Sequence, residues 1–249
     1  MLAPTIAALL AAIVATSFLS GIFGMAGGMI LLGILLAVLS LPEAMALHAV
    51  TQMASNGWRG LLWIGYVQWR SAAAFLSGCA ISFAVWSVWR YVPDKAMTLI
   101  LLGAAPFIVR LLPASLSPDA ERPLHGVLVG GASMILMLLA GVSGPLIDTY
   151  FLGGKLERRQ IVATKAVCQV CSHAAKLLYF GGLVDRAAAI DPVLAGMAIV
   201  ATIIGTSMSR PVLERLTDTQ YRVWAMRIIT VIASAYIAQG LYQFAAATN

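Results

Sequence analysis

The chain has 249 residues, of which 61% are hydrophobic and only 10% are charged, and its formal net charge is +6. Soluble domains average roughly 45–50% apolar and about 25% charged residues, so this composition excludes an ordinary water-exposed surface. The basic excess contains no Lys/Arg-rich run, which argues against a nucleic-acid partner and is typical of the loops of membrane proteins. We therefore predict an all-α polytopic membrane protein whose solvent is the lipid bilayer.

Charges and prolines divide the sequence into eight apolar segments, in chain order 5–41, 44–67, 71–91, 95–112, 123–153, 159–181, 187–209 and 220–246. Six of them are close to the roughly 20 residues that one helical span requires. The first 21 residues lack the basic region of a cleaved signal peptide, so we expect them to remain in the membrane.

Segments 5–41 and 123–153 are too long for one span, and glycines interrupt both of them. The interruptions read GIFGMAGGM at 21–29 and GVSGPLID at 141–148. Glycine permits sharp turns, and Pro145 removes a backbone donor. We predict that each long segment is a broken helical hairpin. Paired breaks of this kind are typical of the binding site of a transporter.

The two halves of the chain resemble each other. Shifted by 117 residues, HAVTQMASNGWRGLLWIGYV (48–67) aligns with KAVCQVCSHAAKLLYFGGLV (165–184), so that Gln52, Ser55 and Arg59 meet Gln169, Ser172 and Lys176. Polar residues that repeat in register inside apolar sequence indicate an internal duplication. We predict repeats at 1–113 and 123–249, joined by a linker at 114–122, each built of a broken hairpin and three transmembrane helices.

If each broken hairpin enters and leaves on one face, each repeat crosses the membrane an odd number of times and the two repeats are inverted. The flanking loops then carry nine Lys and Arg residues on one side and three on the other. If the long segments cross once, the split is eight to four. Because basic loops stay in the cytoplasm, the inverted arrangement is preferred, with both termini outside.

A polar face runs along one helix of each repeat. His48, Gln52, Ser55 and Arg59 are spaced to lie within about 60° of one another on a helix, with Asn56 beside them. The second repeat has an equivalent face, which consists of Lys165, Gln169, Ser172 and Lys176, with His173 beside them. The glutamines and serines could simply join helices through hydrogen bonds, and this alternative stays open.

The cations on these faces favour a bound anion. A charge at membrane depth costs at least about 2.5–3.5 kcal/mol, so such residues face the bundle interior or a wet cavity. Arg59, Lys165 and Lys176 have no acid on their own helices, and the nearest candidates are Glu43 and Asp148. A half-helix N-terminus at each break adds free N–H groups, and its glycines let the backbone approach a ligand.

The predicted substrate-binding residues are Gly24, Gly27, Gly28, His48, Gln52, Ser55, Asn56, Arg59, Gly144, Lys165, Gln169, Ser172, His173 and Lys176. His48, Asp148 and His173 are candidates for proton coupling, since imidazole titrates near neutral pH. No cofactor is expected. A metal site of Cys168, Cys171 and His173 is disfavoured because no fourth ligand is evident.

Two other functions fit part of the pattern. The motif Gly-x-Ser-Gly at 141–144 matches the surroundings of the nucleophile in rhomboid-type serine proteases, with Ser143 as nucleophile and His173 as base. The first repeat has Phe23 at the position of Ser143, so a duplicated break explains the motif without catalysis, and we expect no enzyme. A passive anion channel shares most features of a carrier, but duplicated broken helices favour the carrier.

Short motifs in both halves resemble the TauE/SafE sulfite-exporter family of bacterial membrane transporters. They are GMAGGM (24–29), AVTQ (49–52), GYVQW (65–69), ATK (163–165) and GGLVD (181–185), and the resemblance covers nearly the whole chain. It implies a multi-pass protein of the bacterial inner membrane that moves sulfite, a sulfonate such as sulfoacetate, or another sulfur-containing anion by alternating access.

The chain departs from the family pattern at both breaks. The family usually has Gly-x-Gly-Gly-Gly at the break, whereas this chain has Gly24-Met25-Ala26-Gly27-Gly28. The second break continues to Asp148, an acid that would repel anionic cargo unless it were protonated or paired with Lys165.

Overall fold

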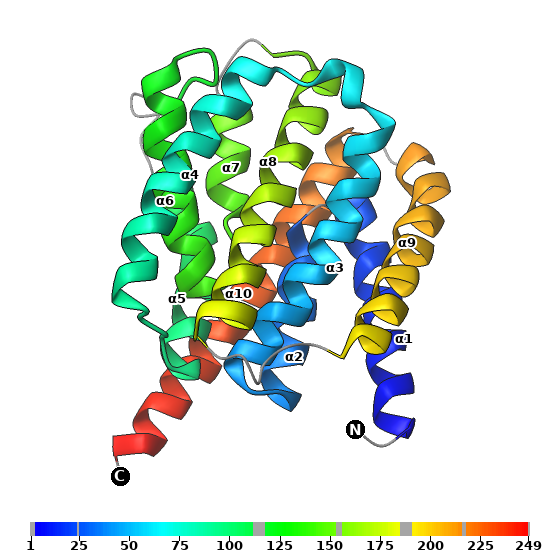
Figure 1. Cartoon of the computed structure of the whole chain (residues 1–249). Helices are drawn as coiled ribbons and strands as arrows, with labels where there is room; N and C mark the ends of the chain where they lie inside the picture. Colours follow the sequence, from blue (N-terminus) through cyan, green and yellow to red (C-terminus); the bar gives the residue numbers. More distant parts are fainter. Residues whose placement is uncertain are drawn as a thin grey trace.

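The computed structural model describes residues 3–23, 25–111, 118–152, 156–184, 191–215 and 218–248 (Figure 1). These ranges are almost entirely helical and contain no strand, which confirms the all-α prediction. The α-helices are α1 (Ala3–Phe23), α2 (Met25–Val38), α3 (Leu41–Leu62), α4 (Trp69–Trp89), α5 (Lys95–Arg110), α6 (Pro123–Ala140), α7 (Gly144–Leu152), α8 (Arg158–Leu178), α9 (Pro192–Arg215) and α10 (Asp218–Thr248). Short segments extend α3 and α8, namely a 3₁₀ turn, η1 (Ile64–Tyr66), and a π-helical segment, η3 (Tyr179–Val184).

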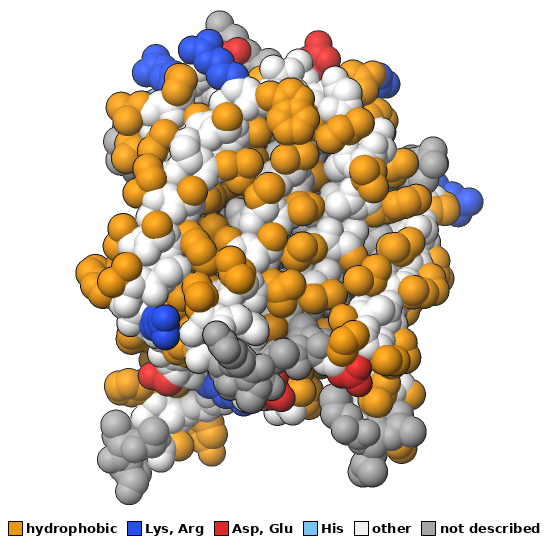
Figure 2. Space-filling model, in the orientation of Figure 1, with side chains coloured by type: hydrophobic (Ala, Val, Ile, Leu, Met, Phe, Trp, Pro, Cys, Tyr) orange, Lys and Arg blue, Asp and Glu red, His pale blue; other side chains and the backbone are white. Residues whose placement is uncertain are grey.

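Six helices are long and apolar enough to cross a membrane: α1, α4, α6, α8, α9 and α10. Helix α3 has 22 residues, but its polar face lowers its hydropathy, and α5 has only 16 residues. Apolar side chains cover the body of the molecule, and Lys, Arg, Asp and Glu gather toward its two ends (Figure 2). The chain is therefore a multi-pass membrane protein, as predicted.

Local signals explain where several helices start. Ser40 precedes α3, and its backbone N–H donates to Glu43 Oε2 at 3.0 Å, as in a capping box. The Asp94 side chain accepts from the Met97 backbone N–H at 2.7 Å and caps α5. Since Glu43 is engaged at the start of α3, it is not the partner of the cations farther along the chain.

Both long apolar segments contain two helices, as predicted. In the first segment α1 and α2 pack against each other so closely that a Cβ on Gly27 would lie 2.0 Å from the Thr16 carbonyl oxygen. In the second, Gly141 has φ of +76° and ends α6 in a left-handed cap. Pro145 does not cause this break, because it lies in the first turn of α7, where a missing N–H costs no helical hydrogen bond.

The helix contacts between the two halves of the chain are symmetric. In chain order, α1 to α5 of the first half correspond to α6 to α10 of the second half. Helix α3 packs on its counterpart α8, and α5 packs on its counterpart α10, while the contact of α4 with α6 corresponds to that of α9 with α1. In Figure 1, α3 and α8 run in opposite directions, and the start of α1 and the end of α10 lie at the same end of the bundle.

Glycines allow the paired helices to approach closely. A Cβ on Gly130 would lie 1.9 Å from the Phe75 carbonyl oxygen across the α4–α6 contact, and one on Gly205 would lie 2.3 Å from the Val14 carbonyl oxygen across α1–α9. Membrane helices associate through close backbone packing, since lipid provides little hydrophobic drive for their association. These glycines therefore hold the bundle together.

Replacing Gly130 with alanine should destabilise the protein, whereas the same change at Gly131 should not. The new Cβ at 130 would overlap backbone, while at 131 its nearest neighbours would be the Ser82 hydroxyl at 3.0 Å and the Gly78 carbonyl oxygen at 3.6 Å. Overpacking costs roughly 1–3 kcal/mol, which should lower the Tm by roughly 5 °C. Thermal unfolding in detergent measures both variants, and equal Tm values for the two would contradict this account.

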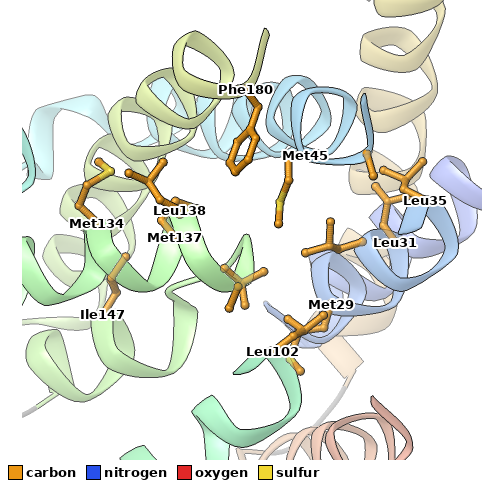
Figure 3. Packing of buried hydrophobic residues seen from close by; sticks show 14 of the residues in the cluster. Met29, Leu31, Leu35, Met45, Leu102, Met134, Met137, Leu138, Ile147 and Phe180 are labelled. Atoms are coloured by element: carbon orange, nitrogen blue, oxygen red, sulfur yellow. The ribbon is translucent and has the colours of Figure 1, made fainter. Parts of the chain in front are cut away.

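Buried apolar side chains from both halves meet in one core. Figure 3 shows α2 contributing Met29, Leu31 and Leu35 to a cluster that Met134 and Met137 of α6 also join. Because this core spans both halves, the predicted domains 1–113 and 123–249 share buried surface. Of the predicted linker at 114–122, residues 114–117 lie outside the described residues, and the remainder forms a turn that leads into α6.

Candidate functional site

A small cavity of about 30 Å³ lies where the two breaks and the two polar helix faces meet. The first half supplies Ser20 at the end of α1, Met25 and Gly28 from α2, and His48, Gln52 and Arg59 from α3. The second half supplies Val142, Ser143 and Gly144 from the break, and Lys165, Gln169 and His173 from α8. Residues separated by more than 100 positions in sequence thus line one cavity inside the bundle.

The antiparallel packing of α3 and α8 produces this arrangement. Their polar faces oppose each other, so that the last turn of α3, with Arg59, lies at the same end as the second turn of α8, with Lys165. The two breaks also touch, because a Cβ on Gly144 would lie 2.9 Å from the Met25 Cβ. The cavity therefore lies between two half-helix N-termini, the starts of α2 and α7.

A chain of hydrogen bonds beneath the cavity connects the two halves. The Lys176 side chain is fully buried, and its Nζ donates to His48 Nδ1 at 2.7 Å and to the Gly141 carbonyl at 2.9 Å. His48 Nε2 donates in turn to the Gly28 carbonyl at 3.0 Å, so the imidazole carries its proton on Nε2. This network joins both breaks through α3 and α8.

Lys176 is placed where a cation is tolerated without an acid. No carboxylate within the described ranges pairs with it, but Gly141 is the C-terminal cap of α6. The negative end of a helix dipole stabilises a cation, and its free carbonyls accept hydrogen bonds. Lys176 does not itself line the cavity. An effect of Lys176 on an anion in the cavity would therefore be exerted through His48 or through its charge.

Two cations, Arg59 and Lys165, line the more exposed end of the cavity, and Asp148 lies beside Lys165. The Lys165 side chain is 22% exposed and forms an ion pair with Asp148 of α7, which is 33% exposed. Arg59 is half-buried, and its guanidinium donates to Asn56 Oδ1 at 3.0 Å. Asp148 is therefore paired with Lys165, which is one of the two alternatives that the sequence left open for this acid. Asn56 supports Arg59 from behind the cavity wall.

Ser55 and Ser172, which were predicted as binding residues, are not among the residues that line the cavity. The Ser55 hydroxyl lies 3.2 Å from Thr206 Oγ1 of α9. The Ser172 hydroxyl donates to the Cys168 carbonyl at 2.9 Å and lies 3.8 Å from Cys79 Sγ of α4. Both serines thus contact a neighbouring helix, as the alternative of hydrogen bonds that join helices predicts.

The glycines of the first break differ in position. Gly28 lines the cavity, and a Cβ there would approach the Gln52 amide oxygen at 3.1 Å. Gly27 instead faces α1, where its missing side chain admits the Thr16 carbonyl. Gly24 lies outside the described residues. Gln52 and Gln169, from equivalent positions of the two halves, both line the cavity as predicted.

Four lining residues were not predicted as binding residues: Ser20, Met25, Val142 and Ser143. Each lies in or beside one of the two glycine-rich breaks, so proximity to the breaks was the available signal. Ser143 was considered only as a nucleophile. Its hydroxyl has no hydrogen-bond partner in the described part of the chain, and therefore none with His173, although a nucleophile–base pair requires such a bond.

The residues proposed for a metal do not converge. Cys168 is buried whereas Cys171 is exposed. Among the residues that the structure describes, no group of three or more His, Cys, Asp and Glu side chains could hold a metal ion. The geometry instead offers a half-polar cavity with several hydrogen-bond donors and cations at membrane depth.

Comparison with known proteins agrees with this geometry. The model of the family described as sulfite exporter TauE/SafE matches residues 8–236, nearly the whole chain. No curated protein and no solved structure gives a significant match. The matched range includes both breaks and all twelve residues that line the cavity. The chain belongs to the sulfite exporter TauE/SafE family of membrane transporters.

Proposed function

We propose that this protein is a secondary transporter that moves a small sulfur-containing anion, such as sulfite or an organosulfonate, across the bacterial inner membrane. The carrying observation is the cavity that both breaks and both polar faces line, with Arg59 and Lys165 at its more exposed end and Lys176 beneath it. Fixed cations and half-helix N-termini inside a bundle favour a small anion as ligand.

The two halves are inverted repeats in this proposal, and transport proceeds by alternating access. The exchange of helix pairs between the halves supports a pseudo-two-fold axis, and the opposite directions of α3 and α8 support inversion (Figure 1). Rocking of one repeat against the other around a site between them is the usual mechanism of such folds.

Export is the direction that we propose, and the orientation of the more exposed end of the cavity supports it. The lining becomes more exposed from His48 (0%) to Lys165 (22%). The arginines that flank the helix ends on this side are Arg70, Arg110, Arg122 and Arg159, whereas Arg90 and Lys95 flank the opposite ends. Since cytoplasmic loops are enriched in basic residues, the charged mouth faces the cytoplasm, from which an exporter takes its cargo.

Proton coupling is assigned to Asp148. Of the three candidates, His48 is engaged by Gly28 and Lys176, and His173 is buried, whereas Asp148 is partly exposed at the mouth. An anion that binds Lys165 competes with the Asp148 carboxylate, so protonation of Asp148 would accompany loading. Export of the anion would then be linked to proton movement.

Labelled sulfite, sulfoacetate, thiosulfate and sulfate fluxes in proteoliposomes test the proposal. We expect saturable flux of at least one sulfur anion, which a pH gradient changes, and a loss of roughly 10-fold or more in Arg59→Ala, because a charged hydrogen-bonding partner is removed. Arg122→Ala, which changes a largely exposed arginine outside the cavity, should transport normally. Single-channel currents in planar bilayers would indicate a channel, and equal flux in both variants would exclude this site.

A further inference from the structure

The start of α7 has a capping residue whose side chain does not cap. Ser143 precedes α7, and its carbonyl accepts from the Ile147 backbone N–H at 3.1 Å, as an N-cap residue does. A serine at this position normally accepts a hydrogen bond from the first turn through its hydroxyl. Here Ser143 Oγ is buried, with the residue 1% exposed, and has no hydrogen-bond partner within the described residues.

A second buried polar atom without a partner lines the same cavity. His173 is 3% exposed, and among the described residues its Nδ1 makes no hydrogen bond. Its ring packs edge-on against His48, with 5.6 Å between the ring centroids. Buried polar groups are almost always hydrogen-bonded in folded proteins. Two such atoms in one small cavity therefore indicate that a polar ligand supplies the missing hydrogen bonds.

Among the described residues of the first half, no buried polar side-chain atom without a hydrogen-bond partner lines the cavity. The residue that corresponds to Ser143 is Phe23, which has no side-chain donor. His48 differs from His173 in that both of its ring nitrogens are engaged, by Gly28 and by Lys176. The lining residues at the first break are Ser20, Met25 and Gly28. Unsatisfied hydrogen-bonding capacity therefore gathers on the side of the second repeat.

We propose that the hydroxyl of Ser143, Nδ1 of His173 and the first turn of α7 form a subsite for the oxygen atoms of an oxyanion. The first backbone N–H groups of a helix have no intrahelical partner and carry partial positive charge, so they favour an anionic oxygen at the position that the serine hydroxyl leaves open. With its proton on Nδ1, the imidazole adds another donor. Pro145 has no N–H to offer, so Ser143 provides a donor in its place.

This inference rests on the proposed transport function and makes it more specific. Substrate is held asymmetrically, with its oxyanion group against the second break, and the cations at the mouth act on charge at longer range. The ligand class is a small anion whose negative charge is spread over several oxygens, because three groups of donors converge from the start of α7, from Ser143 and from α8. An oxyanion presents a separate oxygen to each of the three groups, whereas chloride presents a single acceptor atom.

Ser143→Ala and His173→Phe test the subsite, with Ser133→Ala as the matched control. Ser133 is likewise 1% exposed with no partner for its hydroxyl in the described part of the chain, but it lies in α6 and does not line the cavity. Dissociation constants for sulfite, methanesulfonate and chloride would be measured by calorimetry on the purified protein in detergent. Thermal unfolding would be measured in parallel.

We expect Ser143→Ala and His173→Phe each to weaken binding of sulfite and methanesulfonate by roughly 10-fold. The Tm should stay within error, since Ser143 Oγ and His173 Nδ1 have no hydrogen-bond partner among the described residues. Chloride affinity should fall less than sulfite affinity, because chloride presents a single acceptor atom. Ser133→Ala should bind all three ligands as the wild type does. Wild-type affinity for sulfite in both cavity variants, together with intact wild-type transport, would overturn the subsite and leave the proposed function standing. If the wild type neither binds nor transports any sulfur oxyanion, the proposed function itself fails.

Discussion

Lys176→Met is expected to lower the rate of anion transport by about 100-fold while leaving a folded protein. The side chain is fully buried, and its Nζ bonds both His48 and the C-terminal cap of α6. At an effective dielectric constant of about 20, a unit charge about 6 Å from an anion contributes roughly 3 kcal/mol, which is about 100-fold in binding. Methionine keeps most of the volume, so the packing of α8 should be retained.

Lys95→Met is the matched control for this change. Lys95 also donates from Nζ to a carbonyl just beyond the end of a half-helix, that of Leu39 after α2, at 2.8 Å. It lies at the end of the bundle away from Arg59 and Lys165, and it does not line the cavity. Proteoliposome flux should be normal in Lys95→Met and nearly absent in Lys176→Met. Comparable flux in the two variants would show that the buried network has no part in transport.

Asp148→Asn is expected to tighten anion binding. The variants of Arg59, Ser143 and His173 are expected to weaken it. Its carboxylate neutralises Lys165 at the mouth, so the amide leaves one more net positive charge there. A unit charge about 8 Å away contributes about 2 kcal/mol at a dielectric constant near 20, and partial exposure reduces this to about 1 kcal/mol. The KM for sulfite should therefore fall on the order of 5-fold, and flux should lose its dependence on the pH gradient.

Two further measurements separate this effect from a change in folding. The double variant Asp148→Lys with Lys165→Asp restores an ion pair in reverse and should return the KM toward the wild-type value. Asp119→Asn removes a carboxylate from a surface ion pair with Arg122 and should leave the KM unchanged. A KM that rises in Asp148→Asn, or flux that remains pH-driven, would contradict the proposed competition between carboxylate and cargo.

The helices and their breaks could be predicted because their signals are local. Apolar segments of spanning length correspond to helices, and the glycine cluster at 141–144 ends α6 through the left-handed conformation of Gly141. The repeated Gln52 and Gln169 also indicated which faces meet, and both line the cavity. Each of these features depends on residue type and on spacing within one turn or one segment.

The precise membership of the site could not be obtained in this way. A sector of about 60° on a helix is wide enough to face two neighbouring helices at once. Ser55 and Ser172 share this sector with the glutamines that line the cavity, yet their hydroxyls contact α9 and α4. The pairing of Lys165 with Asp148 likewise depends on how α7 packs beside α8. Sequence spacing does not specify these orientations.

The sequence by itself determined that the chain is a helical membrane protein and that its two longest apolar segments are each broken into two helices. It could do so because hydrophobicity and backbone freedom are properties of individual residues. The tertiary structure alone decided that Lys176 bonds His48 across 128 positions, and that Ser143 and His173 direct unsatisfied polar atoms into one cavity. The physical reason is that hydrogen bonding and burial are relations between side chains on different helices, and only the packing of those helices establishes them.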